Sequence, residues 1–229
     1  QFVYPKWEDL ESWVHYKRSR SNAHIDEIEV TLGVVGPPAL GEPIQKAVHK
    51  HISNSPVPKG WSNQIDFEPG LILSWQRRWP RAFHIDAGDF RFAAEPHINI
   101  SLGNIYTYAG SGLMFSFGPY QGYLQDTPPR VRPAAPGSGY FETPDQGWSW
   151  YAFAGADGRA VARNIFLDGN TFSESHRVDK NYFVGDLSAG LAFTLDDYRI
   201  SYSVNKRSDE FKGQAADSVF GSITLSTRF

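Results

Sequence analysis

Alternation of apolar and polar residues, repeated along most of the chain, constrains the fold more than any other feature. Successive side chains of a strand point to opposite faces, so a period of two indicates a strand with one apolar and one polar face. The clearest example is Tyr182–Asp196, and others are Asp26–Val35, Leu71–Trp79, His97–Gly103, Tyr198–Asn205 and Ser218–Phe229. Roughly eight or nine such segments predict an all-β, antiparallel protein.

The composition of the two faces distinguishes two kinds of β-protein. A soluble sandwich also alternates, but its polar faces usually carry Lys and Glu. Here the polar faces are mostly Ser, Thr, Gly, Asn and Gln, and the apolar faces carry aromatic residues near the strand ends, as at Trp148 and Trp150. The chain also ends on Phe229, as bacterial outer-membrane barrels commonly do. These features favour a transmembrane barrel over a sandwich, which stays the alternative.

Composition excludes several classes of protein. Cysteine is absent, which rules out disulfides, thiolate metal sites and cysteine nucleophiles. The formal net charge is −3, so no basic excess suggests nucleic acid as a partner. The sequence contains no run of about 18 apolar residues, the length that would predict a transmembrane helix. The 229 residues fit a single domain, 1–229. The first residues, Gln1-Phe2-Val3, carry neither an initiator Met nor a secretory signal, so we expect a processed product or a fragment.

Two regions interrupt the alternation. Leu40–Ile52 has apolar residues at helical spacing and Pro43 near its start, which predicts one short helix. Thr127–Gly139 contains four prolines and predicts a rigid extended loop.

Motifs of common hydrolases and nucleotide-binding proteins are missing from the sequence. It has no G-x-S-x-G nucleophile elbow, no phosphate-binding loop and no H-E-x-x-H motif. His49 and His51 are two residues apart, a spacing that does not place two helical side chains on one face. Asp168-Gly169-Asn170 suggests either a cation site or a tight turn, and this residue combination favours the turn.

Gln45 and His49 are the strongest candidates for a pair of catalytic residues. They lie four apart in the predicted helix, so both project from one face, roughly opposite Ile44 and Ile52. A histidine can take a proton from water near neutral pH, and a neighbouring amide can orient it or polarise a carbonyl. Taken alone, these residues fit a solvated helix face better than a site.

Longer motifs around this helix resemble the lipid A 3′-O-deacylase family of outer-membrane barrel hydrolases. They run in order from about Asp26 to Phe229. The matching motifs are Leu32-Gly33-Val34-Val35-Gly36-Pro37, Leu40-Gly41-Glu42, Gln45-x-x-x-His49, Pro58-x-Gly60-Trp61-x-Asn63-Gln64, Glu68-Pro69-Gly70-Leu71, Gly103-Asn104-Ile105-Tyr106-Thr107-Tyr108, Arg130-x-Arg132-Pro133, Gly158 through Asn170, and Phe211-Lys212-Gly213-Gln214.

The resemblance implies a fold and a function. The fold is an antiparallel barrel of about a dozen strands in the outer membrane of a Gram-negative bacterium. The implied activity is calcium-dependent hydrolysis of the ester that holds the 3′ acyl or acyloxyacyl chain on lipid A. His49 is the implied general base that activates water, and Gln45 is the amide in the same site. The expected partners are lipid A or lipopolysaccharide and the membrane, and the expected state is a monomer.

The amino-terminal part departs from the family pattern. Residues 1–25 match none of the family's first strands, and no role is transferred to Asp9. We therefore expect a barrel that lacks its first strands and the upstream catalytic residues. A non-catalytic barrel fragment or structural outer-membrane protein is the alternative function. Arg159 and Arg163 are interpreted either as ligands of lipid A phosphates or as partners of acidic residues inside the barrel.

Overall fold

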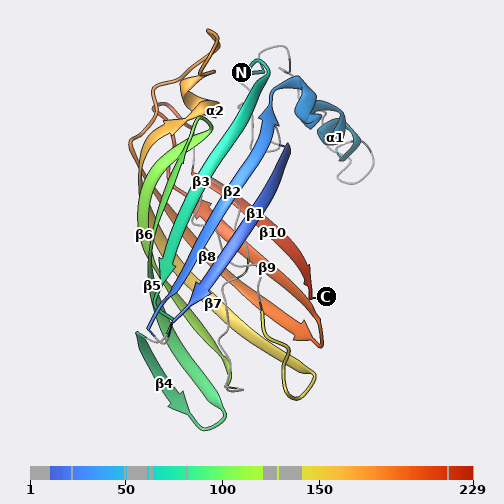
Figure 1. Cartoon of the computed structure of the whole chain (residues 1–229), viewed down its shortest axis with the longest axis vertical. Helices are drawn as coiled ribbons and strands as arrows, with labels where there is room; N and C mark the ends of the chain where they lie inside the picture. Colours follow the sequence, from blue (N-terminus) through green and yellow to red (C-terminus); the bar gives the residue numbers. More distant parts are fainter. Residues whose placement is uncertain are drawn as a thin grey trace.

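The fold is a strongly curved antiparallel sheet with two short helices at one end (Figure 1). A computed structural model describes residues 11–21, 23–48, 50, 61, 64–80, 82–120, 128, 141–215 and 217–228. Within these residues no helix is long and apolar enough to span a bilayer.

Nine strands follow one another around the sheet, in the order β1-β2-β3-β5-β6-β7-β8-β9-β10, and β4 pairs only with β5. Their bounds are β1 Glu11–Arg20, β2 Ile25–Val35, β3 Glu68–Arg78, β4 Phe83–Ala87, β5 Phe90–Gly103, β6 Tyr106–Pro119, β7 Trp148–Asn164, β8 Phe183–Leu195, β9 Tyr198–Arg207 and β10 Ser218–Thr227. β1 and β10 form the two edges, and no ladder joins them within the described residues. The sheet is thus a half-barrel, which confirms the predicted all-β, antiparallel barrel class.

The outer face of the sheet is apolar and exposed. On β8, for example, Leu187 and Leu191 are each more than half exposed, whereas Asp186 and Ser188, on either side of Leu187, are buried. The same arrangement recurs around the sheet, with outward residues that include Ile28, Leu32, Leu71, Leu73, Ile98, Ile100, Leu102, Ile200, Val204, Val219, Ile223 and Leu225. The predicted alternation is confirmed, and its apolar side faces outward, as lipid contact requires.

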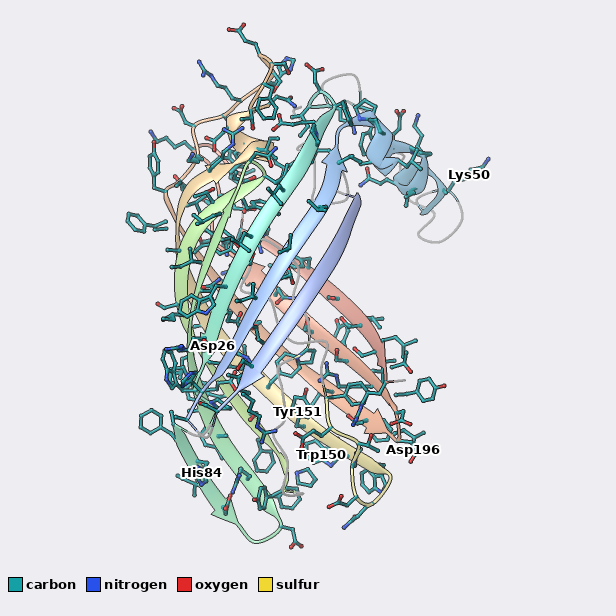
Figure 2. All side chains as sticks on the ribbon, viewed as in Figure 1. Asp26, Lys50, His84, Trp150, Tyr151 and Asp196 are labelled. Atoms are coloured by element: carbon teal, nitrogen blue, oxygen red, sulfur yellow. The ribbon has the colours of Figure 1, made fainter. Side chains whose placement is uncertain are left out.

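Aromatic side chains gather on the outer face toward the end opposite the helices. Phe90 stacks on Phe117 with ring centroids 5.5 Å apart, and Trp150 packs against both rings. On the neighbouring strands Trp148 stacks on Phe193. Figure 2 shows Trp150 at this end of the sheet. The predicted concentration of aromatic residues near strand ends is confirmed, and it matches the interfacial girdle of membrane barrels.

The inner face holds apolar clusters at both ends and charged residues between them. Near the helices, ten buried residues pack together: Val35, Ile65, Ile72, Ile105, Tyr106, Tyr108, Val161, Ile165, Phe166 and Val184. Toward the other end a smaller cluster consists of Met114, Tyr151, Phe153 and Ala192. The charged residues therefore lie in a part of the interior where only other protein groups surround them.

These charged residues lie along one line across the strands, interrupted by Gly112. We call this line the charged row. Each residue is the register partner of the next on the neighbouring strand: Arg78, His97, Gly112, Asp157, Asp186 and Arg207. At one end of the row Arg78 donates to Glu27 and Glu95, all at 3.1 Å. At the other end Asp186 accepts hydrogen bonds from Arg159 and Arg207.

Gly112 allows the middle of the charged row to form. His97 on β5 and Asp157 on β7 are separated by β6, yet His97 Nε2 lies 2.5 Å from Asp157 Oδ1, and both side chains are almost fully buried. A Cβ at position 112 would lie 2.5 Å from that oxygen and 2.7 Å from His97 Cε1. The pair therefore occupies the space that a side chain on β6 would fill.

A loop segment before β7 connects the two edges of the sheet at the end opposite the helices. Arg20, at the end of β1, donates to Glu142 at 2.8 Å, and Arg228, just after β10, donates to Thr143 at 3.0 Å. The distance between the two edges at this end is thus held by side chains rather than by a strand ladder.

Several local features differ from the sequence prediction or lie outside the described residues. The predicted helix Leu40–Ile52 is observed as α1, Gly41–Val48, while residues 49 and 51–60 are outside the described part. The proline-rich stretch 127–139 lies outside it too, except for Pro128, and so does Phe229. A second helix, α2 (Ile165–Asp168), and strand β1 were not predicted.

The Gly112 arrangement predicts a specific sensitivity. Gly112→Ala forces His97 and Asp157 apart and crowds the carbonyl of Ala156, so we expect a loss of about 1–3 kcal/mol of stability from overpacking. The temperature at which the heat-modifiable folded band disappears on a gel measures it.

Gly158→Ala is the matched control, because no atom lies within 4 Å of a Cβ built there. Equal midpoints for the two variants would contradict the proposed role of Gly112.

Candidate functional site

The end of the sheet with the helices carries the long connection between β2 and β3, which contains α1. The chain leaves β2 at Val35, passes through a 3-10 turn at Pro37–Ala39 and enters α1 at Gly41. Leu40 adopts a left-handed conformation with φ 59°, which redirects the chain between the turn and the helix. Figure 1 shows α1 projecting from the end of β2, to the side of the sheet.

The two sides of α1 have different environments. Gly41 is buried and Gln45 is half-buried, so this side is turned toward the protein. On the other side Leu40 and Ile44 are 50% and 56% exposed. Figure 2 shows Lys50 at the end of this segment farthest from the sheet. The helix thus turns an amide inward and Ile44 outward, with Leu40 just before it also exposed, the reverse of a helix that packs on a soluble core.

The two predicted site residues are not equally described. Gln45 lies on the inward side of α1. His49 lies outside the described residues, so its predicted proximity to Gln45 stays a prediction. Gln45 is therefore the one of these two predicted site residues that the structure describes.

Next to the end of this connection, the carboxylate of Glu68 joins three segments of chain. Glu68 is 1% exposed, and it accepts hydrogen bonds from Asn104 Nδ2 at 2.7 Å, Thr171 N at 2.6 Å and Asn170 Nδ2 at 3.3 Å. Asn104 belongs to the β5–β6 turn, and Asn170 and Thr171 to the β7–β8 connection. We call these four residues the Glu68 network. Sequence reasoning placed Glu68 within a motif without a role and interpreted Asn170 only as part of a turn or cation site.

The Glu68 network also fixes the backbone just before β3. The Asn170 side chain accepts from Asp66 N and donates to Asp66 O, both at 2.9 Å. Close by, a Cβ at Gly36 would lie 2.8 Å from Asp66 O, so the two ends of the α1 connection are in contact. Gly36 has φ +88° and no side chain, and both properties are needed there.

The arginine and turn hypotheses can now be compared with the structure. Arg163 donates to Asn104 O, Gly169 O and Thr171 Oγ1, so it holds backbone together. Arg159 forms an ion pair with Asp186 inside the sheet, as one of the two interpretations predicted.

Asp168 forms hydrogen bonds with Lys180 Nζ at 2.7 Å, and Gly169 has φ +80°. Asp168-Gly169-Asn170 is therefore a turn, the favoured alternative.

The described residues include no cluster of acidic side chains typical of a calcium site. Among them no group of three or more His, Asp or Glu side chains is arranged to hold a metal ion. The most enclosed carboxylate at this end, Glu68, has N–H donors at both oxygens, an arrangement that satisfies an anion. Calcium, implied by the family resemblance, thus stays a prediction.

Known proteins resemble this chain over nearly its whole length. Residues 10–229 match the model of a protein family described as outer membrane protein LpxR. Among solved structures, LpxR from Salmonella typhimurium has a TM-score of 0.78 and 23% sequence identity, and the match covers 93% of this chain and 71% of that chain. No curated protein sequence matches. The outer-membrane barrel fold and the predicted outer-membrane location are confirmed, and the family match begins before Asp26.

The environment of α1 predicts which of its residues contact lipid. A nitroxide attached at Ile44→Cys should collide with oxygen more often than with a water-soluble nickel complex in reconstituted vesicles, because Ile44 faces away from the protein. The absence of native cysteine makes a single label possible.

A nitroxide at Glu42→Cys, on the polar side, is the control and should show the opposite preference. If both labels collide mainly with the nickel complex, α1 lies in water and its apolar side does not contact lipid.

Proposed function

Because this chain belongs to the LpxR family of outer membrane proteins, we propose that it is a carboxylic ester hydrolase that acts as a monomer on lipid A. The bond cleaved is the ester that holds the 3′ acyl or acyloxyacyl chain. Family membership confirms the resemblance found in the sequence motifs. The substrate, the reaction and the residues that perform it are the content of the proposal.

One structural observation carries most of the support: the orientation of α1. Its inward side holds Gln45, and its outward side exposes Leu40 and Ile44. A site for a soluble substrate has no need of such a surface. A site for a lipid ester does, because the acyl chains must stay in an apolar environment while the ester meets polar groups. The nearby outward residues Leu32 and Leu71 extend this apolar surface along the wall.

The proposed mechanism uses water as the nucleophile, which fits the absence of a serine nucleophile elbow from the sequence. The spacing of four residues predicts that His49 projects from the same side of a helix as Gln45. His49 takes a proton from water, and the hydroxide formed attacks the ester carbonyl to give a tetrahedral oxyanion. The oxyanion then collapses with cleavage of the bond to the sugar oxygen. The His49 proton passes to that oxygen, so the products are a fatty acid and a free 3′ hydroxyl.

Gln45 has a positioning or electrophilic role in this scheme. Its side-chain amide offers both a carbonyl acceptor and N–H donors. The acceptor can orient the imidazole of His49, and the donor can hydrogen-bond to the carbonyl oxygen as negative charge develops there. A half-buried position suits both roles, because hydrogen bonds to developing charge are stronger where water is excluded.

The His49 variant tests the catalytic assignment. His49→Ala should lower the rate of lipid A deacylation by about 10²–10⁴-fold, the usual contribution of a general base. The loss of one 3′ acyl group from lipid A in expressing cells, seen as a decrease in mass, measures the activity.

His84→Ala provides the matched control, since His84 is exposed on β4 at the opposite end of the molecule (Figure 2). Deacylation that survives His49→Ala would remove His49 from the mechanism. Lipid A of unchanged mass with the unsubstituted, folded chain would instead support a non-catalytic barrel.

Calcium dependence is proposed from the family alone. Deacylation by the purified protein should stop in EDTA and return when calcium is added in excess, whereas added magnesium should not restore it. Full activity in EDTA after dialysis would refute the calcium requirement without affecting the assignment of His49.

A further inference from the structure

We propose that Glu68 is a positioning residue, whose network with Asn104, Asn170 and Thr171 holds α1 in its catalytically active position at the end of β2. This inference rests on the proposed function for its effect on catalysis, but its structural content can be tested independently. Glu68 lies outside α1 and acts through the chain that carries it.

The first argument is that the buried carboxylate of Glu68 requires hydrogen-bond donors at a fixed place. A fully buried carboxylate is expensive unless hydrogen bonds satisfy its oxygens. Glu68 meets this requirement with three donors that come from two different connections. A Gln at this position would present an NH₂ group to at least one N–H donor. The site therefore selects a carboxylate, and with it a fixed distance between β3 and the two connections.

The second argument is where the network acts. The connection from Gly36 to Phe67 is long, but its ends touch at Gly36 and Asp66. Asn170 is shared between Glu68 and both backbone groups of Asp66. Displacing the Asn170 amide therefore releases one end of the connection that bears Gln45. Asp66 packs against Gly36, just before the turn that leads into α1, so loss of this support loosens the turn and α1 gains freedom.

The third argument is that other contacts hold the network itself rigid. Asn104 Oδ1 accepts from Leu71 N at 2.8 Å, and Asn104 Nδ2 also donates to Pro69 O at 2.8 Å. Arg163 donates to backbone or side-chain oxygens of Asn104, Gly169 and Thr171. Contacts that do not involve Glu68 thus fix its donors to the strands of the barrel. The network therefore fixes the α1 connection relative to these strands.

The expected consequence is a loss of catalytic rate without loss of the barrel. A displacement of about 1 Å between a base and its substrate can cost about 10²-fold in rate. We expect Glu68→Gln to lower kcat for lipid A deacylation by about 10- to 100-fold with little change in KM. Heat-modifiable migration on a gel gives the folded fraction, to which kcat is normalised.

The direct test is the mobility of α1. A nitroxide at Lys46→Cys, an exposed position on α1, reports local motion in the full chain reconstituted in lipid vesicles. We expect a sharper, more mobile spectrum in the Glu68→Gln background than in the unsubstituted background. Glu27→Gln is the matched control, because Glu27 is also a buried carboxylate but binds Arg78 in the charged row. An equally mobile label in the Glu27→Gln background, or no change with Glu68→Gln, overturns the proposal.

A reciprocal exchange separates the hydrogen bond from general destabilisation. In Glu68→Gln with Asn104→Asp, the donor and acceptor between the two side chains are reversed and the charge is kept. We expect label immobility and kcat to be higher in this double variant than in Asn104→Asp alone, which shares the loss of the donor to Pro69 O, and no difference between the two would count against the network. If no variant deacylates lipid A, including the unsubstituted chain, the proposed function fails, while the label mobility still decides the role of Glu68.

Discussion

The structure depends on one constraint, that polar groups on the inner face must satisfy one another. The middle of the outer face is apolar and its charged residues, such as Arg77 and Asp26, lie near strand ends, so the charges of the central region lie inside, where burial makes an unpaired charge costly. The charged row answers this with contacts across strands: Glu27 and Glu95 share Arg78, His97 meets Asp157, and Asp186 lies between two arginines.

Pairing of this kind also fixes the strand register. A shift by one residue would turn every charge outward into the apolar face. The charged row thus allows only one alignment of the strands in this curved sheet. The loops at both ends of the sheet are built on that alignment.

The same logic explains the end of the molecule that carries α1. There the inner face is apolar, and polar loops cross above it, so their buried groups need partners among themselves. Glu68 supplies acceptors for two of these connections, and Arg163 supplies donors for the same segments. The helix beside them turns its amide toward the protein and its apolar residues outward. A lipid ester can meet such a surface without leaving the membrane.

Much of the fold follows from the sequence because strand alternation is local. Tyr182–Asp196 and Asp26–Val35 show their two faces without knowledge of any partner strand, and both faces were predicted correctly. Strand β1 was missed because its adjacent apolar residues, Trp13 and Val14, break the period of two. The helix α2 is a single turn whose signals, Asn164 at its start and Gly169 at its end, are too short to stand out.

The charged row and the candidate site were harder to predict because their contacts are distant in sequence. His97 and Asp157 are 60 residues apart, and they meet only because the registers of three strands align over Gly112. Glu68 and Thr171 are 103 residues apart, and the donor is a backbone N–H that any residue carries. Gln45 and His49 were found because their spacing is that of one helical turn, a local signal. The family motifs, rather than the spacing, gave that pair its proposed chemistry.

The central claim is that this chain hydrolyses the 3′ ester of lipid A by direct attack of water on the acyl carbonyl. Incubation of the reconstituted protein with lipid A in H₂¹⁸O, followed by mass spectrometry of both products, tests it most directly. The account predicts one ¹⁸O atom in the carboxyl group of the released fatty acid and none in the 3′ hydroxyl of the sugar. Label in the sugar hydroxyl, or no released fatty acid from a folded protein supplied with calcium, would contradict it.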